Sequence, residues 1–164
     1  MDKHRTKDKT NAMRIIESKG LDYKLHTCQC EEAKSADEIA LIFGKEPERV
    51  FKTLVTVGRS GEHYVFMLPA CDELDLKKAA KAVGEKSVEM VRSKELLPLT
   101  GYIHGGCSPI GMKKFFRTTA HITARDCETI TFSAGRIGWM AEMSPGDLGR
   151  AIRLEYADVA RDRV

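Results

Sequence analysis

Two neighbouring stretches of mostly apolar residues, interrupted by polar ones, predict a β-hairpin. Residues 50–57 read VFKTLVTV and residues 63–68 read HYVFML, and both are rich in β-branched and aromatic side chains. Gly58-Arg59-Ser60-Gly61 lies between them, and its length and glycine content are typical of a hairpin loop. Further short strands are predicted at residues 21–27, 87–91, 118–122 and 129–133.

Signals for the ends of helices divide the remaining chain into short helical segments. Ser35-Ala36-Asp37-Glu38 has the form of a capping box, and the helix that it opens is expected to stop near Gly44. Thr10 or Asn11 caps the first helix, and Ser144-Pro145 supplies a cap and an N1 proline for the last one. Helices are predicted near residues 11–19, 36–43, 74–83, 93–97 and 145–152.

The order of these segments indicates an α+β fold. Short strands and short helices are mixed without the regular alternation of a parallel βαβ protein. We expect a curled, mainly antiparallel mixed sheet, partly barrel-like and flanked by short helices. For 164 residues one domain is the default. The polar residues 1–9 are expected to form a flexible tail, and residues 10–164 the domain.

Composition and charge restrict the class of protein. Hydrophobic residues make up 42% of the chain and charged residues 31%, which is ordinary for a soluble globular protein. No apolar run approaches the ~18 residues of a membrane span, and the first nine residues lack the apolar part of a secretory signal. We therefore expect a cytoplasmic protein without membrane contacts.

The small excess of positive charge argues against a DNA-binding protein. The net charge is +3, from 27 basic and 24 acidic residues. Local basic clusters still offer surfaces to an RNA, with the solvated face of a helix as the alternative for each. They comprise Lys77, Lys78 and Lys81 in one segment and Lys113, Lys114 and Arg117 in another.

The cysteines do not form a metal-binding pattern. Cys28 and Cys30 are the one close pair, and neither a second pair nor a His-x₃₋₅-His motif accompanies them. We expect reduced, mostly buried thiols at Cys28, Cys30, Cys71, Cys107 and Cys127. The sequence predicts neither a metal nor another cofactor.

A glycine-rich stretch and an isolated lysine are the candidates for chemistry. Residues 101–111 read GYIHGGCSPIG, which favours a rigid loop whose N–H groups can bind a carbonyl oxygen or a phosphate. A tight turn is the alternative. Lys52 stands near the start of an apolar strand. It either extends into water or is a cation held at the rim of a pocket.

Several motifs occur together in one order, and the set resembles the YbaK/EbsC family. They are Val50-Phe51-Lys52-Thr53-Leu54, Leu74-Asp75-Leu76-Lys77-Lys78, Thr100-Gly101-Tyr102, Gly105 to Lys114, Ser133-Ala134-Gly135-Arg136 and Gly146-Asp147-Leu148. The family comprises freestanding relatives of the editing domain inserted in bacterial prolyl-tRNA synthetase. The resemblance covers about residues 10–160.

The resemblance implies an enzyme that removes a wrong amino acid from tRNA. The expected substrate is cysteine esterified to tRNA(Pro), with Cys-tRNA(Cys) as a second candidate. Selection by size in an apolar pocket is worth only ~1–3 kcal/mol, so a separate editing step is physically reasonable. The implied partners are the acceptor end of mischarged tRNA and prolyl-tRNA synthetase in a ternary complex.

The resemblance also suggests the site residues. Lys52 matches the family's lysine and would anchor the terminal nucleotide or the substrate carbonyl. With Gly105 and Ser108, whose loop offers backbone N–H groups as an oxyanion hole, it forms the expected catalytic set. The substrate's own thiol, rather than Cys107 or another protein nucleophile, is implied to assist ester cleavage. The expected substrate-binding residues are His26, Cys28, Thr53, Gly106, Cys107, Pro109, Ser133, Gly135 and Met140.

Two positions depart from the cysteine-editing pattern. Cys28 stands where such members carry a tyrosine, and Met140 where they carry an aspartate. The pocket should therefore be less polar, which keeps alanine or another small amino acid open as the substrate. The sequence is also compatible with a module that binds tRNA or the synthetase without chemistry, and with a binder of small nucleotides or anions.

Overall fold

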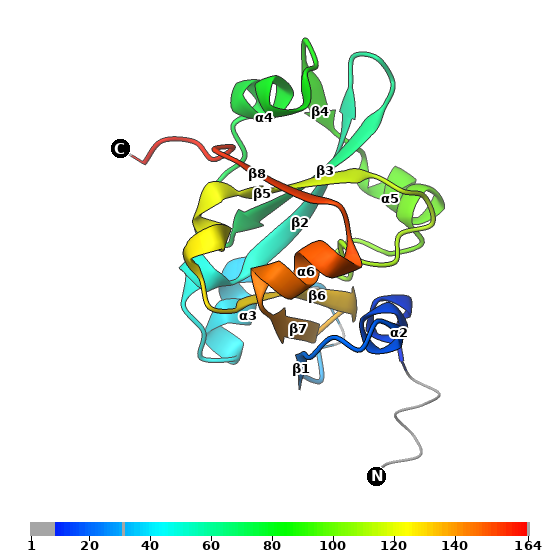
Figure 1. Ribbon diagram of the computed structural model, residues 1–164, viewed down its shortest axis with the longest axis vertical. Helices are drawn as coiled ribbons and strands as arrows, with labels where there is room; N and C mark the ends of the chain where they lie inside the picture. Colours follow the sequence, from blue (N-terminus) through cyan, green and yellow to red (C-terminus); the bar gives the residue numbers. More distant parts are fainter. Residues whose placement is uncertain (1–8, 31, 164) are drawn as a thin grey trace.

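The computed structural model describes residues 9–30 and 32–163 and forms two β-sheets with short helices around them (Figure 1). The tail expected at residues 1–9 therefore lies, except for Lys9, outside the described residues. The strands are β1 (Lys24–Thr27), β2 (Phe51–Gly58), β3 (His63–Pro69), β4 (Val88–Met90), β5 (Arg117–His121), β6 (Ile130–Arg136), β7 (Trp139–Met143) and β8 (Leu154–Ala157).

The helices lie at the positions that the sequence signals indicate. The Ser35 side chain accepts a hydrogen bond from the Glu38 N–H at 3.1 Å, and the Glu38 carboxylate accepts one from the Ser35 N–H, so the capping box is confirmed. None of the described helices is long and apolar enough to span a bilayer. They are α2 (Asn11–Ser18), α3 (Ala36–Ile42), α4 (Leu76–Val83), α5 (Ser93–Thr100) and α6 (Pro145–Ala151), with 3₁₀ turns η1 (Pro47–Arg49) and η2 (Ile122–Asp126).

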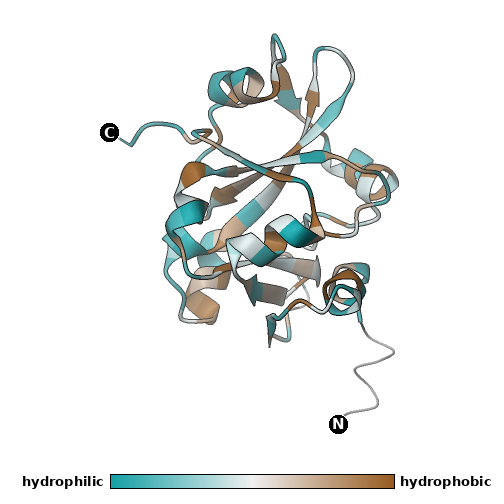
Figure 2. Cartoon of the chain, in the orientation of Figure 1, coloured by the Kyte–Doolittle hydropathy of each residue, from teal (hydrophilic) through white to brown (hydrophobic). Residues whose placement is uncertain are grey.

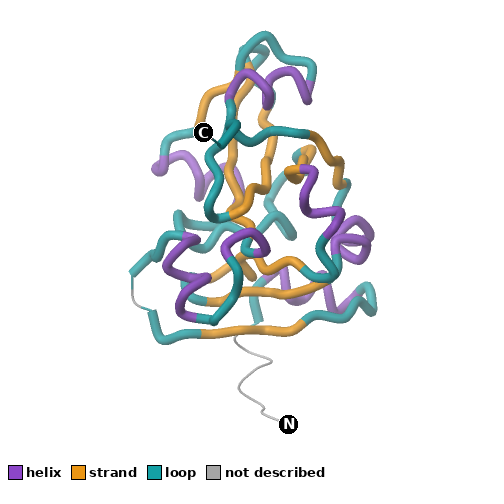
Figure 3. The backbone as a smooth tube through the Cα atoms, turned by 90° about the vertical axis from the view of Figure 1, so that its left-hand side faces the viewer, coloured by secondary structure: helices purple, strands orange, loops and turns teal. Residues whose placement is uncertain are grey.

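The strands form two separate sheets, which Figure 3 shows in two groups. One sheet has the order β1-β7-β6 and is antiparallel, and the other has the order β4-β2-β3-β5-β8, with β5 parallel to both of its neighbours. The expectation of a mixed, mainly antiparallel α+β fold is confirmed. The barrel-like part of it is wrong, because the sheets do not close on themselves.

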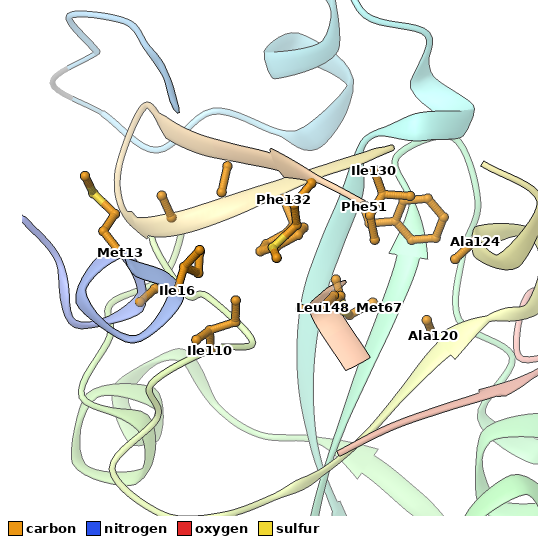
Figure 4. Packing of buried hydrophobic residues seen from close by; sticks show 14 residues of the cluster. Met13, Ile16, Phe51, Met67, Ile110, Ala120, Ala124, Ile130, Phe132 and Leu148 are labelled. Carbon is orange, nitrogen blue, oxygen red and sulfur yellow. The ribbon is translucent and has the colours of Figure 1, made fainter. Parts of the chain in front are cut away.

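The main core lies between the two sheets and is covered by α2 and α6 (Figure 4). Phe51, Met67 and Phe132 are completely or almost completely buried there, and Ile16 and Leu148 reach the same cluster from the helices. A second apolar cluster packs α4 against the opposite face of the five-stranded sheet (Figure 2 shows the hydropathy of these elements). The two clusters fix β2 and β3 from both faces, so these strands form a rigid platform.

One edge of β2 changes its neighbour along the strand. At the start of β2, Val50 forms a bridge with Thr131 of β6, and at its end residues 56–58 pair with β4. Residues 52–54 have neither partner on this edge. We call this gap the β2 window (residues 52–54). It exists because β4 is only three residues long and ends at Met90.

Candidate functional site

A cavity of about 510 Å³ opens at the β2 window. This volume lies within the ~300–1,000 Å³ that is usual for small-molecule sites. Its walls come from Ala70, next to the end of β3, and from five other parts of the chain that are distant in the sequence. They are residues 51–55 of β2, residues 34–37 and Ile39 at the start of α3, residues 90–93 with Leu96, the loop residues His104, Gly105 and Cys107, and Ser133 with Met140 of the antiparallel sheet.

Lys52 brings an uncompensated positive charge to this cavity. The residue is half-buried on the rigid strand β2 and lines the cavity. Within the described part of the chain it has no carboxylate partner and no side-chain hydrogen bond. A lysine that is partly removed from water without a counter-ion favours an anionic or strongly polar ligand. Of the two interpretations of Lys52, the structure favours a cation at a pocket.

Thr53 adds unpaired polar groups beside Lys52. Its Oγ1 is buried and has no hydrogen-bond partner among the described residues. The Val55 carbonyl accepts a hydrogen bond from the Val91 N–H at 3.1 Å, which shows that the odd-numbered residues of β2 direct their backbone groups toward this edge. The N–H and C=O of Thr53 therefore face the β2 window. A buried hydroxyl without a partner is costly, so Thr53 places an unsatisfied polar group at the cavity wall.

The glycine-rich loop contributes to the cavity with only part of its length. Gly105 and Cys107 line the cavity, whereas Gly106, Ser108 and Pro109 are buried and lie outside its lining. The Gly106 N–H donates to the Ile103 carbonyl at 3.0 Å, and the Ser108 Oγ accepts from the Ile110 N–H at 3.2 Å. Of the four N–H groups from Gly105 to Ser108, only that of Gly106 has a partner among the described residues, so the expected oxyanion hole stays a prediction. The Ser108 side chain also holds the loop in shape.

Close packing explains why glycine is needed at positions 105 and 106 of the loop. A Cβ at Gly105, which has φ 84°, would overlap the Cβ of Ala33, and one at Gly106 would lie 3.0 Å from the Ile137 backbone nitrogen. Only glycine lets this loop approach both segments so closely. Gly105 consequently brings its backbone into the cavity wall without a side chain in the way.

Cys107 is a poor nucleophile in this position. Its thiol is buried, and burial raises its pKa to about 11. The reactive thiolate is therefore scarce at neutral pH. The side chain packs with Val55, Leu96 and Tyr102 and gives the cavity an apolar surface.

The opposite wall is formed by Ser133 and Met140, which are cross-strand partners on β6 and β7. Met140 packs with Ile39 and Ala40 of α3, so the wall is apolar, as its sequence departure suggests. Ser133 Oγ accepts a hydrogen bond from the Gly135 N–H at 3.1 Å. Gly135 itself lies outside the lining, where an added Cβ would be 2.8 Å from the Tyr102 ring.

His26 belongs to a polar cluster outside the cavity lining. Glu142 Oε1 lies 2.8 Å from His26 Nε2 and 2.9 Å from Lys45 Nζ, and Thr129 Oγ1 donates to Glu142 Oε2 at 2.6 Å. The hydrogen bond from Thr129, helped by those from Lys45 and His26, lowers the pKa of Glu142 to about 2. We call these four residues the Glu142 cluster. It connects β1, β7 and the chain after α3.

Cys28 also lies outside the lining, and the structure joins it to Cys30 in a disulfide. The expectation of reduced thiols is wrong for this pair. The sequence did not predict this disulfide, because a bond between cysteines separated by one residue depends on a local turn of the backbone. Of the remaining cysteines, Cys107 is buried, Cys127 is half-buried and Cys71 is exposed.

Two parts of the cavity were not anticipated from the sequence. The capping box located the start of α3 but not its position beside β2, so residues 34–37 were missed. Residues 90–93 were missed because the short strand β4 gives no signal of where it ends relative to β2. In the described ranges no group of three His, Cys, Asp or Glu side chains is arranged to hold a metal.

Comparisons with known proteins identify relatives of this chain. A protein of Enterococcus faecalis, provisionally named Cys-tRNA(Pro)/Cys-tRNA(Cys) deacylase EbsC, is 44% identical over 97% of this chain and 98% of its own length. The proline–tRNA ligase of Shouchella clausii is 31% identical over 70% of this chain, which corresponds to 20% of that enzyme.

Solved structures show the same fold. One, provisionally described as a trans-editing enzyme for prolyl tRNA synthetase, has a TM-score of 0.82 at 24% identity and covers 93% of this chain and 96% of its own. The hypothetical protein APE2540 has a TM-score of 0.84. The model of the aminoacyl-tRNA editing domain matches residues 30–151, which contain every residue of the cavity lining. The chain belongs to the aminoacyl-tRNA editing domain family.

Proposed function

We propose that this protein is a deacylase that acts in the cytoplasm and removes cysteine esterified to tRNA(Pro), with Cys-tRNA(Cys) as a second substrate. The observation that carries the proposal is the cavity at the β2 window, where Lys52 and Thr53 leave a charge and a buried hydroxyl without partners among the described residues. The relative named as such a deacylase is similar over nearly its whole length. Mischarged tRNA is the ligand that would supply matching groups.

The lining suggests a division of roles. The Lys52 ammonium would bind the terminal phosphate or the ester carbonyl, where it also stabilises developing negative charge. The backbone at Gly105 would contact the ester from the other side of the cavity. Thr53 would hold the aminoacyl end through its free N–H and hydroxyl. Ser108 would act only indirectly, by holding the loop.

For the chemical step we propose that the substrate's thiol is the nucleophile. The thiolate sulfur attacks the ester carbonyl carbon, the bond to the 3′ oxygen breaks, and that oxygen takes a proton from water. The resulting thiolactone is hydrolysed by a second water to free cysteine. The high pKa of Cys107 supports this route, because the thiol in the lining is not available as a thiolate. The charge of Lys52 would lower the pKa of the substrate thiol.

Alanyl-tRNA(Pro) is a second candidate substrate. The observation that favours it is the apolar wall at Met140, which packs against α3 and offers no hydrogen bond to a thiol or another polar group. An apolar pocket discriminates poorly between small side chains.

A panel of aminoacyl-tRNA(Pro) substrates tests both candidates. We expect Cys-tRNA(Pro) to be cleared and 2-aminobutyryl-tRNA(Pro), which has a methyl group in place of the thiol, to persist. Equal rates on the two would contradict the thiol-assisted step. Fastest clearance of Ala-tRNA(Pro) would support the second candidate, and binding without turnover of any substrate would identify a non-catalytic module.

We further propose that prolyl-tRNA synthetase joins the complex. The net charge of +3 allows few phosphate contacts, so the protein alone should hold RNA loosely. A synthetase that retains its tRNA would supply the missing affinity. The test is the deacylation rate at low enzyme concentration with and without added synthetase, and an unchanged rate would contradict this partner.

A further inference from the structure

We propose that a groove beside helix α4 binds the phosphate backbone of the RNA whose 3′ end enters the cavity. This inference rests on the proposed function. The groove has a volume of about 510 Å³ and lies between α4 and the chain leading into β4. Figure 1 shows these two elements side by side at one end of the molecule. Lys77, Lys81 and Lys86 line the groove, together with Leu76 and Val88.

The three groove lysines are exposed cations without counter-ions among the described residues. Lys77 and Lys81 are one helical turn apart and so lie on the same side of α4. Neither they nor Lys86 contact a carboxylate within the described ranges. Lys78 is different, because its Nζ binds Asp158 at 3.1 Å and Asp162 at 2.8 Å. Lys78 therefore fastens the C-terminal segment, and its neighbours remain free for a ligand.

The one acid that lines the groove is already engaged. Glu85 accepts hydrogen bonds from the Ser60 N–H at 3.2 Å and from the Tyr64 hydroxyl at 2.7 Å. The hydrogen bonds from Ser60 and Tyr64 lower its pKa, so it remains an anion bound to the β2–β3 hairpin. With three cations and one occupied anion, the groove favours a ligand with repeated negative charges.

Strand β4 connects the groove to the cavity. Its first residue, Val88, lines the groove, and its last residue, Met90, lines the cavity. Side chains alternate along a strand, so Val88 and Met90 share one face and Glu89 points to the other, and the span between them is about 7 Å. Met90 pairs with Thr56 of β2, and Lys52 lies on the same face as Thr56.

The groove and Lys52 therefore lie on the same face of the five-stranded sheet. Met90 is 46% exposed and Leu76 is 40% exposed, and they add apolar surface for bases and riboses along this path. A nucleic acid strand combines regularly spaced phosphates with such apolar surfaces. Its 3′ end reaches the β2 window while its preceding phosphates pass the groove lysines.

The test compares two triple variants with the same change in net charge. In the groove variant Lys77, Lys81 and Lys86 are changed to Gln, and in the control variant Arg14, Lys19 and Lys24 are changed to Gln. The control residues are also exposed and have no ion pair within the described ranges. They belong to α2 and β1 or adjoin them, at the opposite end of the molecule from α4 (Figure 1).

Binding of uncharged tRNA(Pro) is measured over a range of salt concentrations, and cleavage of the 3′-cysteinyl ester of adenosine is measured separately. We expect the groove variant to bind tRNA about tenfold or more weakly. The slope of log K against log salt concentration should be smaller in magnitude by about 2 to 3, since each lost phosphate contact removes ~0.7–0.9 from that slope. The small ester has no phosphate, so its turnover should be unchanged. The control variant should match the wild type closely in both measurements.

Several outcomes would overturn the groove. The groove proposal is wrong if the two variants bind tRNA with equal affinity, or if the wild type binds no tRNA even at low salt. It is also wrong if the groove variant loses activity only when prolyl-tRNA synthetase is present, because the surface would then bind the synthetase. A wild-type protein that binds tRNA through the groove but cleaves neither Cys-tRNA(Pro) nor the small ester would refute the proposed function alone.

Discussion

The β2 window and the Glu142 cluster are both polar regions, but they satisfy their polar groups in opposite ways. In the Glu142 cluster, each carboxylate oxygen has at least one partner within 2.9 Å. At the β2 window, the Lys52 ammonium and the Thr53 hydroxyl have none among the described residues. Paired groups stabilise the fold, whereas unpaired groups reduce stability unless a ligand completes them. The comparison separates a structural histidine from a candidate catalytic lysine.

The largest effect is expected from the two lysines of these regions. Lys52→Ala should lower kcat/KM on Cys-tRNA(Pro) by about 10²–10³-fold, the usual effect of removing one charge-stabilising group, and should leave the melting temperature nearly unchanged. Lys45→Ala should lower the melting temperature and leave kcat/KM nearly unchanged, because Lys45 binds Glu142 and lies outside the cavity lining. Full activity of Lys52→Ala would remove Lys52 from the catalytic set.

Glu142→Gln should give the largest loss of stability. The side chain of Glu142 is 13% exposed, and the neutral amide keeps its shape while removing the charge that His26 and Lys45 face. We expect a decrease of about 2 kcal/mol in the free energy of unfolding, measured in urea. Turnover per folded molecule should change little, and a strong decrease would show that the cluster also positions the cavity.

The same carboxylate predicts a dependence of stability on pH. Its pKa is lowered from 4.5 to about 2 in the folded protein. A depressed carboxyl pKa contributes stability that is fully present above about pH 4.5 and is lost as the pH falls toward 2. Between pH 5 and pH 2, the free energy of unfolding should therefore change less with pH for Glu142→Gln than for the wild type. Parallel curves would mean that another group causes the acid sensitivity.

A pair of threonine variants gives the smallest and finest contrast. Thr53→Val removes a buried hydroxyl without a partner among the described residues, so stability should stay equal or rise by up to about 1 kcal/mol, while activity falls about tenfold. Thr129→Val removes the hydrogen bond to Glu142 and should cost about 1 kcal/mol of stability with activity retained. If both variants behave alike, the distinction between the two regions fails.

Local patterns in the sequence predicted much of the fold. The hairpin of β2 and β3, the capping box of α3 and the last helix after Ser144 follow from rules that act within a few residues, and each is confirmed. Strand β8 was missed. Its four half-buried residues have no clear alternation, and it exists because β5 offers a parallel edge from more than thirty residues earlier in the chain.

The candidate site was only partly predictable for a similar reason. The motif around Lys52 and Thr53 lies on one strand, so its position at a cavity could be anticipated. Ser108 and Gly135 belong to motifs too, but their roles in the fold are a loop hydrogen bond and space for the Tyr102 ring. A motif records that a residue type is required, and only the three-dimensional arrangement shows whether a ligand or a neighbouring segment requires it.

The shortness of the β2 window has a consequence for self-association. An exposed strand edge can pair with the edge of another molecule and begin aggregation. Here the edge is occupied by β6 at one end and by β4 at the other, which leaves three residues, or about 10 Å, between them. This opening is too short to accept a foreign strand, but it is wide enough for a single acyl group. The same geometry that we propose to receive a small ester thus also protects this edge of β2 from pairing with another molecule.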